Sequence, residues 1–82
     1  MKQLFFLHAS WCQPCKMLAP TMDQVSKNIP VRKINIDYEP DVVNRFGVSS
    51  VPTVILVENE REVRRFTGVK SYNEIINWVN NG

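Results

Sequence analysis

The chain of 82 residues is poor in cysteine, glycine and histidine, with two, three and one of these residues respectively. So few glycines, together with a hydrophobic content of 44%, are typical of a globular domain without repeats, linkers or low-complexity segments. The chain also lacks any run approaching the roughly 20 apolar residues of a membrane span. At this length we expect one domain, residues 1–82, whose core needs no disulfide or metal for folding.

The chain also has little excess of one charge over the other. The formal net charge is +2, and the basic residues are scattered except around Arg61, Arg64 and Arg65, which we expect to form a solvated edge-strand face. Neither a nucleic acid nor an anionic membrane is therefore expected as a partner. The apolar run 4–7 is shorter than the roughly 7–15 residues of a secretory signal, so we expect a cytoplasmic protein. In that reducing compartment a close cysteine pair is more often catalytic or metal-binding than structural.

Hydrophobic patterns predict an α/β fold with the element order β-α-β-α-β-β-α. The apolar run 4–7 and the alternating run 31–37 are typical of strands, and a helix between them makes these strands parallel. Residues 53–57 and 62–67 are typical of an antiparallel hairpin. The expected architecture is a four-stranded mixed sheet with helices on both faces.

Three helices are expected. Pro14 suits the first turn of the first helix, and apolar residues at helical spacing continue to Ile29. The second helix is short and ends at Gly47. The third helix opens with Ser71 and Glu74 at capping-box spacing.

Both cysteines, Cys12 and Cys15, lie in the segment HASWCQPCK, after the first expected strand and at the start of the first helix. Reactive groups of α/β sheets collect at this end of the parallel strands, and a helix N-terminus favours a thiolate. We therefore expect Cys12 to attack a substrate disulfide and form a mixed disulfide, with Lys16 nearby adding positive charge. Cys15, one turn further, is placed to attack that mixed disulfide and release the reduced substrate.

Metal sites use the same cysteine spacing, so a zinc site is the main alternative. Structural zinc usually takes four ligands, whereas Cys12, Cys15 and His8 are the ligands available nearby. A second chain or a substrate would have to complete the site, and an iron–sulfur cluster has the same deficit. A metal-binding or adaptor module, and a pair of inert cysteines, remain as alternatives.

The segment WCQPCKMLAP, residues 11–20, resembles the thioredoxin active site, W-C-G-P-C-K followed by a helix proline. KINID (33–37), FGVSSVPT (46–53) and Gly68 follow in thioredoxin order, so the resemblance covers nearly the whole chain. It implies a minimal thioredoxin fold and an electron-carrying enzyme that reduces protein disulfides through a redox-active disulfide, without a metal or other cofactor. It also implies recycling by a thioredoxin-reductase-like enzyme. Ribonucleotide reductase is a candidate client, and a monomer is expected.

The resemblance also implies roles for individual residues. Cys12 matches the family's nucleophile and Cys15 its resolving cysteine. Pro52 matches a proline that follows a cis peptide bond and lies against the disulfide, and the backbone of its neighbour Val51 matches the segment that pairs with the bound substrate chain. The other implied site residues are Trp11 beside the cysteines, Pro14 between them, Gly68 on the substrate-binding surface and Lys33 beneath the site.

Three departures from the thioredoxin pattern matter. The chain starts about one strand and one helix later than a full thioredoxin does. Gln13 replaces the glycine between the two cysteines, so the reduction potential of this protein can differ from the ~−270 mV of thioredoxin. Phe6 aligns with the family's buried aspartate, thought to relay the proton of the resolving cysteine, so Lys33 is expected to lack its usual carboxylate partner. His8 lies on the same strand face as Phe6, nearer the site, and is a hypothetical substitute for proton handling. A half-exposed histidine without a role is the alternative.

The short length also prompts a second functional interpretation, a glutaredoxin-like, glutathione-dependent oxidoreductase. Two features disfavour it. WCQPCK differs from the glutaredoxin C-P-Y-C type, and Gly68 does not belong to the double-glycine stretch that binds glutathione.

Overall fold

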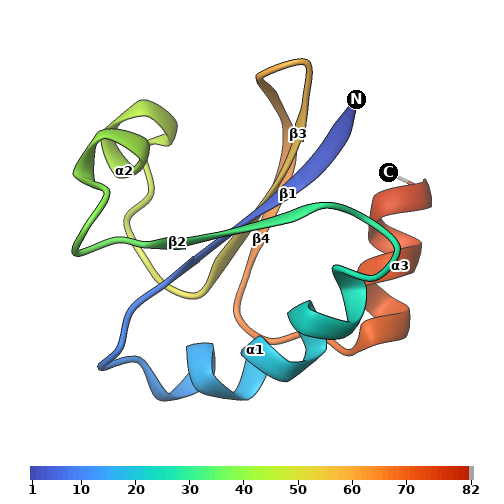
Figure 1. The fold of residues 1–82 in the computed structure, drawn as a ribbon, viewed down its shortest axis with the longest axis horizontal. Coiled ribbons are helices and arrows are strands. Elements are labelled where there is room, and N and C mark those ends of the chain that lie inside the picture. Colours follow the sequence, from blue (N-terminus) through green and yellow to red (C-terminus); the bar gives the residue numbers. More distant parts are fainter. Residues whose placement is uncertain (82) are drawn as a thin grey trace.

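The computed structural model describes residues 1–81. It contains the seven elements in the expected order (Figure 1). They are β1 (Lys2–His8), α1 (Gln13–Val25), β2 (Val31–Asn35), α2 (Pro40–Phe46), β3 (Thr53–Glu58), β4 (Arg61–Thr67) and α3 (Tyr72–Asn81). None of the helices in this part of the chain is long and apolar enough to cross a membrane.

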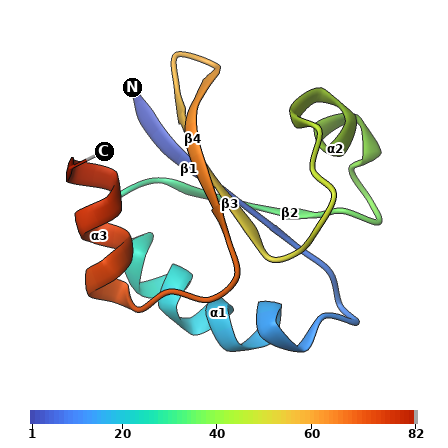
Figure 2. The ribbon, with the colours of Figure 1, turned by 180° about the vertical axis from the view of Figure 1, so that it is seen from behind.

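The four strands form one mixed sheet in the order β2-β1-β3-β4. Strand β1 runs parallel to β2 and antiparallel to β3, and β3 pairs with β4 as an antiparallel hairpin. Helices α1 and α3 cover one face of this sheet, whereas α2 covers the other (Figure 2). The predicted mixed sheet with helices on both faces is therefore confirmed.

Two apolar clusters hold the helices to the sheet. Because successive side chains of a strand point to opposite faces, Leu4 and Phe6 of β1 pack under α1 and α3, while Phe5 and Leu7 pack on the side of α2. Each large apolar side chain that is fully buried contributes about 1.5–3 kcal/mol. The helix residues in the first cluster are Leu18, Met22, Val25, Ile75 and Val79, and those packed against the second are Val42 and Phe46.

Two elements end earlier than the sequence predicts. Helix α1 ends at Val25, because the Ser26 hydroxyl donates to a carbonyl of the last turn and the chain tightens into turns, from which Ile29 still packs on the core. Strand β2 ends at Asn35, whose side-chain Oδ1 accepts the Asp37 N–H at 2.9 Å and closes a turn. This turn carries Asp37 toward the cysteines.

The edge strand β4 is tied to both helical layers by its arginines. Arg64 donates to the backbone oxygen of Trp78 in α3 at 3.1 Å, and Arg65 donates to the backbone oxygen of Phe46 in α2. Both arginines are half-buried, so the expected solvated face is wrong for them, while Arg61 is exposed. Their guanidinium groups thus satisfy backbone carbonyl groups of two helices.

Candidate active site

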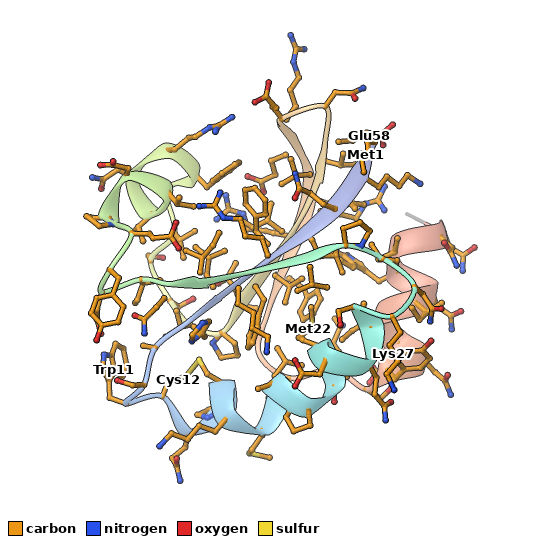
Figure 3. The ribbon with its side chains drawn as sticks, viewed as in Figure 1. Met1, Trp11, Cys12, Met22, Lys27 and Glu58 are labelled. Carbon is orange, nitrogen blue, oxygen red and sulfur yellow. A yellow bond between two sulfur atoms is a disulfide. The ribbon has the colours of Figure 1, made fainter. Side chains whose placement is uncertain are left out.

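Cys12 lies at the end of the sheet opposite Met1 and Glu58 (Figure 3). Strand β1 stops at His8, and the chain turns into α1 with the Cys12 N–H donating to a backbone carbonyl of the intervening loop at 3.2 Å. The two cysteines are joined as a disulfide with 5.3 Å between their Cα atoms. Exposure is 5% for Cys12 and 3% for Cys15, so the disulfide is covered by its surroundings.

Cys12 occupies the N-cap position of α1. Its backbone is extended, with φ −96° and ψ 108°, and its Sγ accepts the backbone N–H of Cys15 at 3.2 Å. The sulfur thus takes the place that a serine or aspartate oxygen usually has at a helix N-terminus. In the reduced protein this N–H and the positive end of the helix both favour a thiolate on Cys12. Pro14 lies in the first turn of α1, as predicted.

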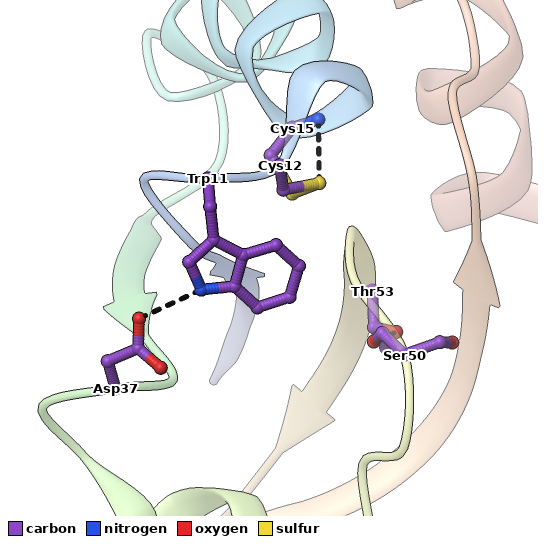
Figure 4. Close-up of a disulfide and its surroundings, with 6 residues drawn as sticks. All are labelled: Trp11, Cys12, Cys15, Asp37, Ser50 and Thr53. Atoms are coloured by element: carbon purple, nitrogen blue, oxygen red, sulfur yellow. Dashed lines mark hydrogen bonds between the residues drawn. A yellow bond between two sulfur atoms is a disulfide. The ribbon is translucent and has the colours of Figure 1, made fainter.

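Trp11 is 65% exposed beside the disulfide, and its position is set by Asp37. The indole Nε1 donates to the Asp37 Oδ2 at 3.1 Å (Figure 4). The sequence did not reveal that Asp37 is the hydrogen-bond partner of Trp11. The available signal was that β1 and β2 are parallel, since residues that follow two parallel strands meet at the same edge of the sheet.

Val51, Pro52 and Gly68 are joined to one another, and Val51 connects them to the disulfide. The Val51–Pro52 peptide bond is cis, as the resemblance implies. Val51 packs against a small cluster that contains Cys12 and Cys15. The Gly68 N–H donates to the Pro52 carbonyl at 3.1 Å, and Gly68 has a φ of 86°, in the left-handed region that favours glycine. The backbone thus joins the end of β4 to the proline loop.

Lys33 pairs with a carboxylate other than the one that Phe6 replaces. Its Nζ lies 2.6 Å from the Oδ1 of Asp23. Asp23 comes from α1, which crosses the sheet near β2, and the two side chains are 51% and 59% exposed. Lys33 is therefore paired with a carboxylate from helix α1, which is more solvated than a carboxylate at the buried position of Phe6 would be.

A pocket of about 190 Å³ lies beside the disulfide between β1, β2 and α1. Burial, and secondly the positive charge of Lys33, lower the pKa of His8 from its ordinary value of 6.5. The ring of His8 lies 5.2 Å from that of Phe6, centroid to centroid. The polar and ionisable side chains that line the pocket are His8, Ser10, Cys15, Lys16 and Lys33.

The structure also bears on a metal site. Within residues 1–81, no group of three or more His, Cys, Asp or Glu side chains is arranged so that it could hold a metal ion. The sulfurs of Cys12 and Cys15, which a zinc site would need as ligands, are joined in a disulfide.

Comparison with known proteins identifies the family. The thioredoxin family model matches residues 2–81. A thioredoxin of Rickettsia bellii is 38% identical over 77 residues, which are 89% of this chain and 73% of that protein. A thioredoxin of Chlamydia caviae is 39% identical over 75 residues, which are 88% of this chain and 74% of the relative.

Solved structures agree with the sequence matches. The thioredoxin-2 of a malaria parasite superposes with a TM-score of 0.90 at 28% identity, covering 100% of this chain and 84% of that one. A thioredoxin variant of Halobacterium salinarum superposes with a TM-score of 0.90 at 26% identity, covering 98% of this chain and 73% of the other. With the Cys12–Cys15 pair in place, these relatives support a dithiol–disulfide oxidoreductase that acts on protein disulfides and is served by a reductase. The chain belongs to the thioredoxin family.

Proposed function

We propose that Cys12 is the nucleophile and Cys15 the resolving cysteine of this oxidoreductase. The Cys12 thiolate attacks a substrate disulfide, forms a mixed disulfide and displaces the first substrate thiolate. Cys15 then attacks the Cys12 sulfur, forms the intramolecular disulfide and displaces the second substrate thiolate. The hydrogen bond at the N-cap of α1 carries this assignment, because the Cys15 N–H points at the Cys12 sulfur and stabilises negative charge there.

We further propose that the substrate chain docks across Trp11, Pro14, Val51, Pro52 and Gly68. Trp11 offers an exposed apolar surface, and the Val51 backbone next to the disulfide is available to pair with an extended segment. The Gly68–Pro52 hydrogen bond supports this surface by holding the proline loop against the end of β4.

Several broader assignments complete the proposal. Residues 1–82 act as one domain, which the single sheet supports. Lys33 supports the site from beneath, through its ion pair with Asp23. The protein works as a monomeric electron carrier in the cytoplasm and contributes to redox homeostasis, with a thioredoxin-reductase-like enzyme as donor and ribonucleotide reductase among the candidate clients. Membership of the thioredoxin family supports these assignments.

Trapping experiments test the cysteine roles. Cys15→Ser leaves the nucleophile but removes the resolving thiol, so partner proteins accumulate as mixed disulfides on Cys12. These are separated on non-reducing gels and identified by mass spectrometry. Cys12→Ser is the matched control and traps few or none. Equal trapping by both variants, or wild-type rates of insulin reduction by Cys12→Ser, would overturn the assignment.

A further inference from the structure

The pocket beside the disulfide brings the single histidine of the chain together with the second cysteine. His8 ends β1, and Cys15 lies in the first turn of α1. Both side chains line the same pocket of about 190 Å³. Because a water molecule occupies roughly 30 Å³ in the liquid, this volume has room for water that bridges an imidazole and a thiol.

His8 is the basic group of this pocket. Lys16 and Lys33 present ammonium groups, which are hydrogen-bond donors without an accepting lone pair. Among the described residues that line the pocket there is no carboxylate, and Asp23 lies outside it, bound to Lys33. A neutral imidazole has a free lone pair on one ring nitrogen and changes its protonation near neutral pH.

The surroundings keep the imidazole in the form that can accept a proton. Burial lowers the pKa of His8 from 6.5, and the positive charge of Lys33 on β2 lowers it further. The charged side chains that line the pocket with His8 are Lys33 from β2 and Lys16 from α1, and Lys33 also pairs with the Asp23 carboxylate. At neutral pH His8 is therefore mostly unprotonated.

We propose that His8 accepts the thiol proton of Cys15 as the Cys15 sulfur attacks the mixed disulfide on Cys12. This inference rests on the cysteine roles proposed above. The Cys15–Cys12 sulfur bond forms while the bond between Cys12 and the substrate breaks, and the substrate sulfur leaves with the bonding electron pair. His8 then passes its proton to that thiolate or to bulk water, so the step needs no further oxidant or reductant.

Rapid mixing of the reduced protein with dithiobis(nitrobenzoate) isolates this step. Attack by Cys12 releases one coloured thiolate at a rate that depends on reagent concentration. Attack by Cys15 on the resulting mixed disulfide releases the second at a rate independent of that concentration. Because nitrothiobenzoate leaves as a thiolate and needs no proton, the pH dependence of the second phase reports on the Cys15 proton.

In the wild type, the rate of the second phase should rise with pH through the lowered pKa of His8 and level off near neutral pH. In His8→Asn that rise should move toward the ordinary cysteine pKa of about 8.5. The rate at neutral pH should fall roughly 10- to 30-fold, since an unassisted thiol is only a few per cent ionised there. Lys33→Gln keeps the imidazole but removes the neighbouring charge, so the rise should shift to higher pH.

Controls separate this inference from the proposed function. Ser10→Ala alters the same pocket without a titrating group and should keep the wild-type profile. An unchanged second phase in His8→Asn would overturn the role of His8, and an unshifted profile in Lys33→Gln overturns it even if His8 variants fail to fold. A second phase that persists in Cys15→Ser, or is missing from the wild type, instead overturns the cysteine roles.

Discussion

The indole Nε1 of Trp11 donates to the carboxylate Oδ2 of Asp37 across 3.1 Å, which ties the loop before α1 to the turn after β2. These residues are 26 positions apart in the chain, and both are exposed. The bond therefore holds an exposed aromatic side chain beside the disulfide, on the surface that we propose binds the substrate.

Removing the acceptor tests that bond. Asp37→Ala should lower the kcat/KM of insulin reduction by about 2- to 10-fold, because a hydrogen bond of this kind is worth about 0.5–1.5 kcal/mol. Asp37→Asn keeps an accepting oxygen and should lose less. If Asp37→Ala and Asp37→Asn lowered kcat/KM equally, the charge of the carboxylate would matter more than its hydrogen bond to Trp11.

Substitution of Gly68 should destabilise the fold. Its φ of 86° suits glycine, and no atom outside its chain neighbours lies within 4 Å of an added Cβ, so the penalty is backbone strain alone. Gly68→Ala should lower the free energy of unfolding by roughly 1–2 kcal/mol, measured by urea denaturation. Gly68→Asn should cost less, since asparagine tolerates this region better. Equal losses in both variants would contradict strain as the cause.

The predicted capping box of α3 is present. The Ser71 N–H donates to the Glu74 Oε1 at 2.9 Å, and the Glu74 N–H donates to the Ser71 Oγ at 3.2 Å. Ser71→Ala should cost about 1 kcal/mol and lower the Tm by about 4–8 °C. Ser71→Thr keeps the hydroxyl and should stay close to the wild type. A Tm unchanged by the alanine variant would show that packing of α3 outweighs its cap.

Stability should depend on the protonation of His8. Because its pKa is lower in the folded protein than its ordinary 6.5, the unfolded chain binds more protons in the window between the two values. The free energy of unfolding should therefore rise with pH through that window and level off above about 6.5.

Urea denaturation across this pH range, compared with His8→Asn, measures the histidine contribution directly. The variant should lack this part of the pH dependence. An NMR titration of the single histidine gives its pKa independently, and a value at or above 6.5 would contradict the lowered pKa.

The order of elements and the place of the cysteines followed from the sequence. Alternation and helical spacing are local properties, so β1, the start of α1 and the cap at Ser71 could be read from neighbouring residues. The ends of α1 and β2 were placed too late, because the side chains of Ser26 and Asn35 form turns that compete with the regular hydrogen bonds. The cis bond before Pro52 came from resemblance to a family rather than from composition or spacing.

The partners of the site residues were decided by the tertiary structure. Trp11 with Asp37, Lys33 with Asp23, and the pocket that joins His8 to Cys15 all link residues from different elements. Such contacts depend on the register of β1 against β2 and on how α1 crosses the sheet, which a local pattern does not specify. The sequence alone determined that a reactive cysteine pair starts a helix after a buried strand. Which side chains lie around this pair was decided by the tertiary structure, because packing brings together residues that are distant in the chain.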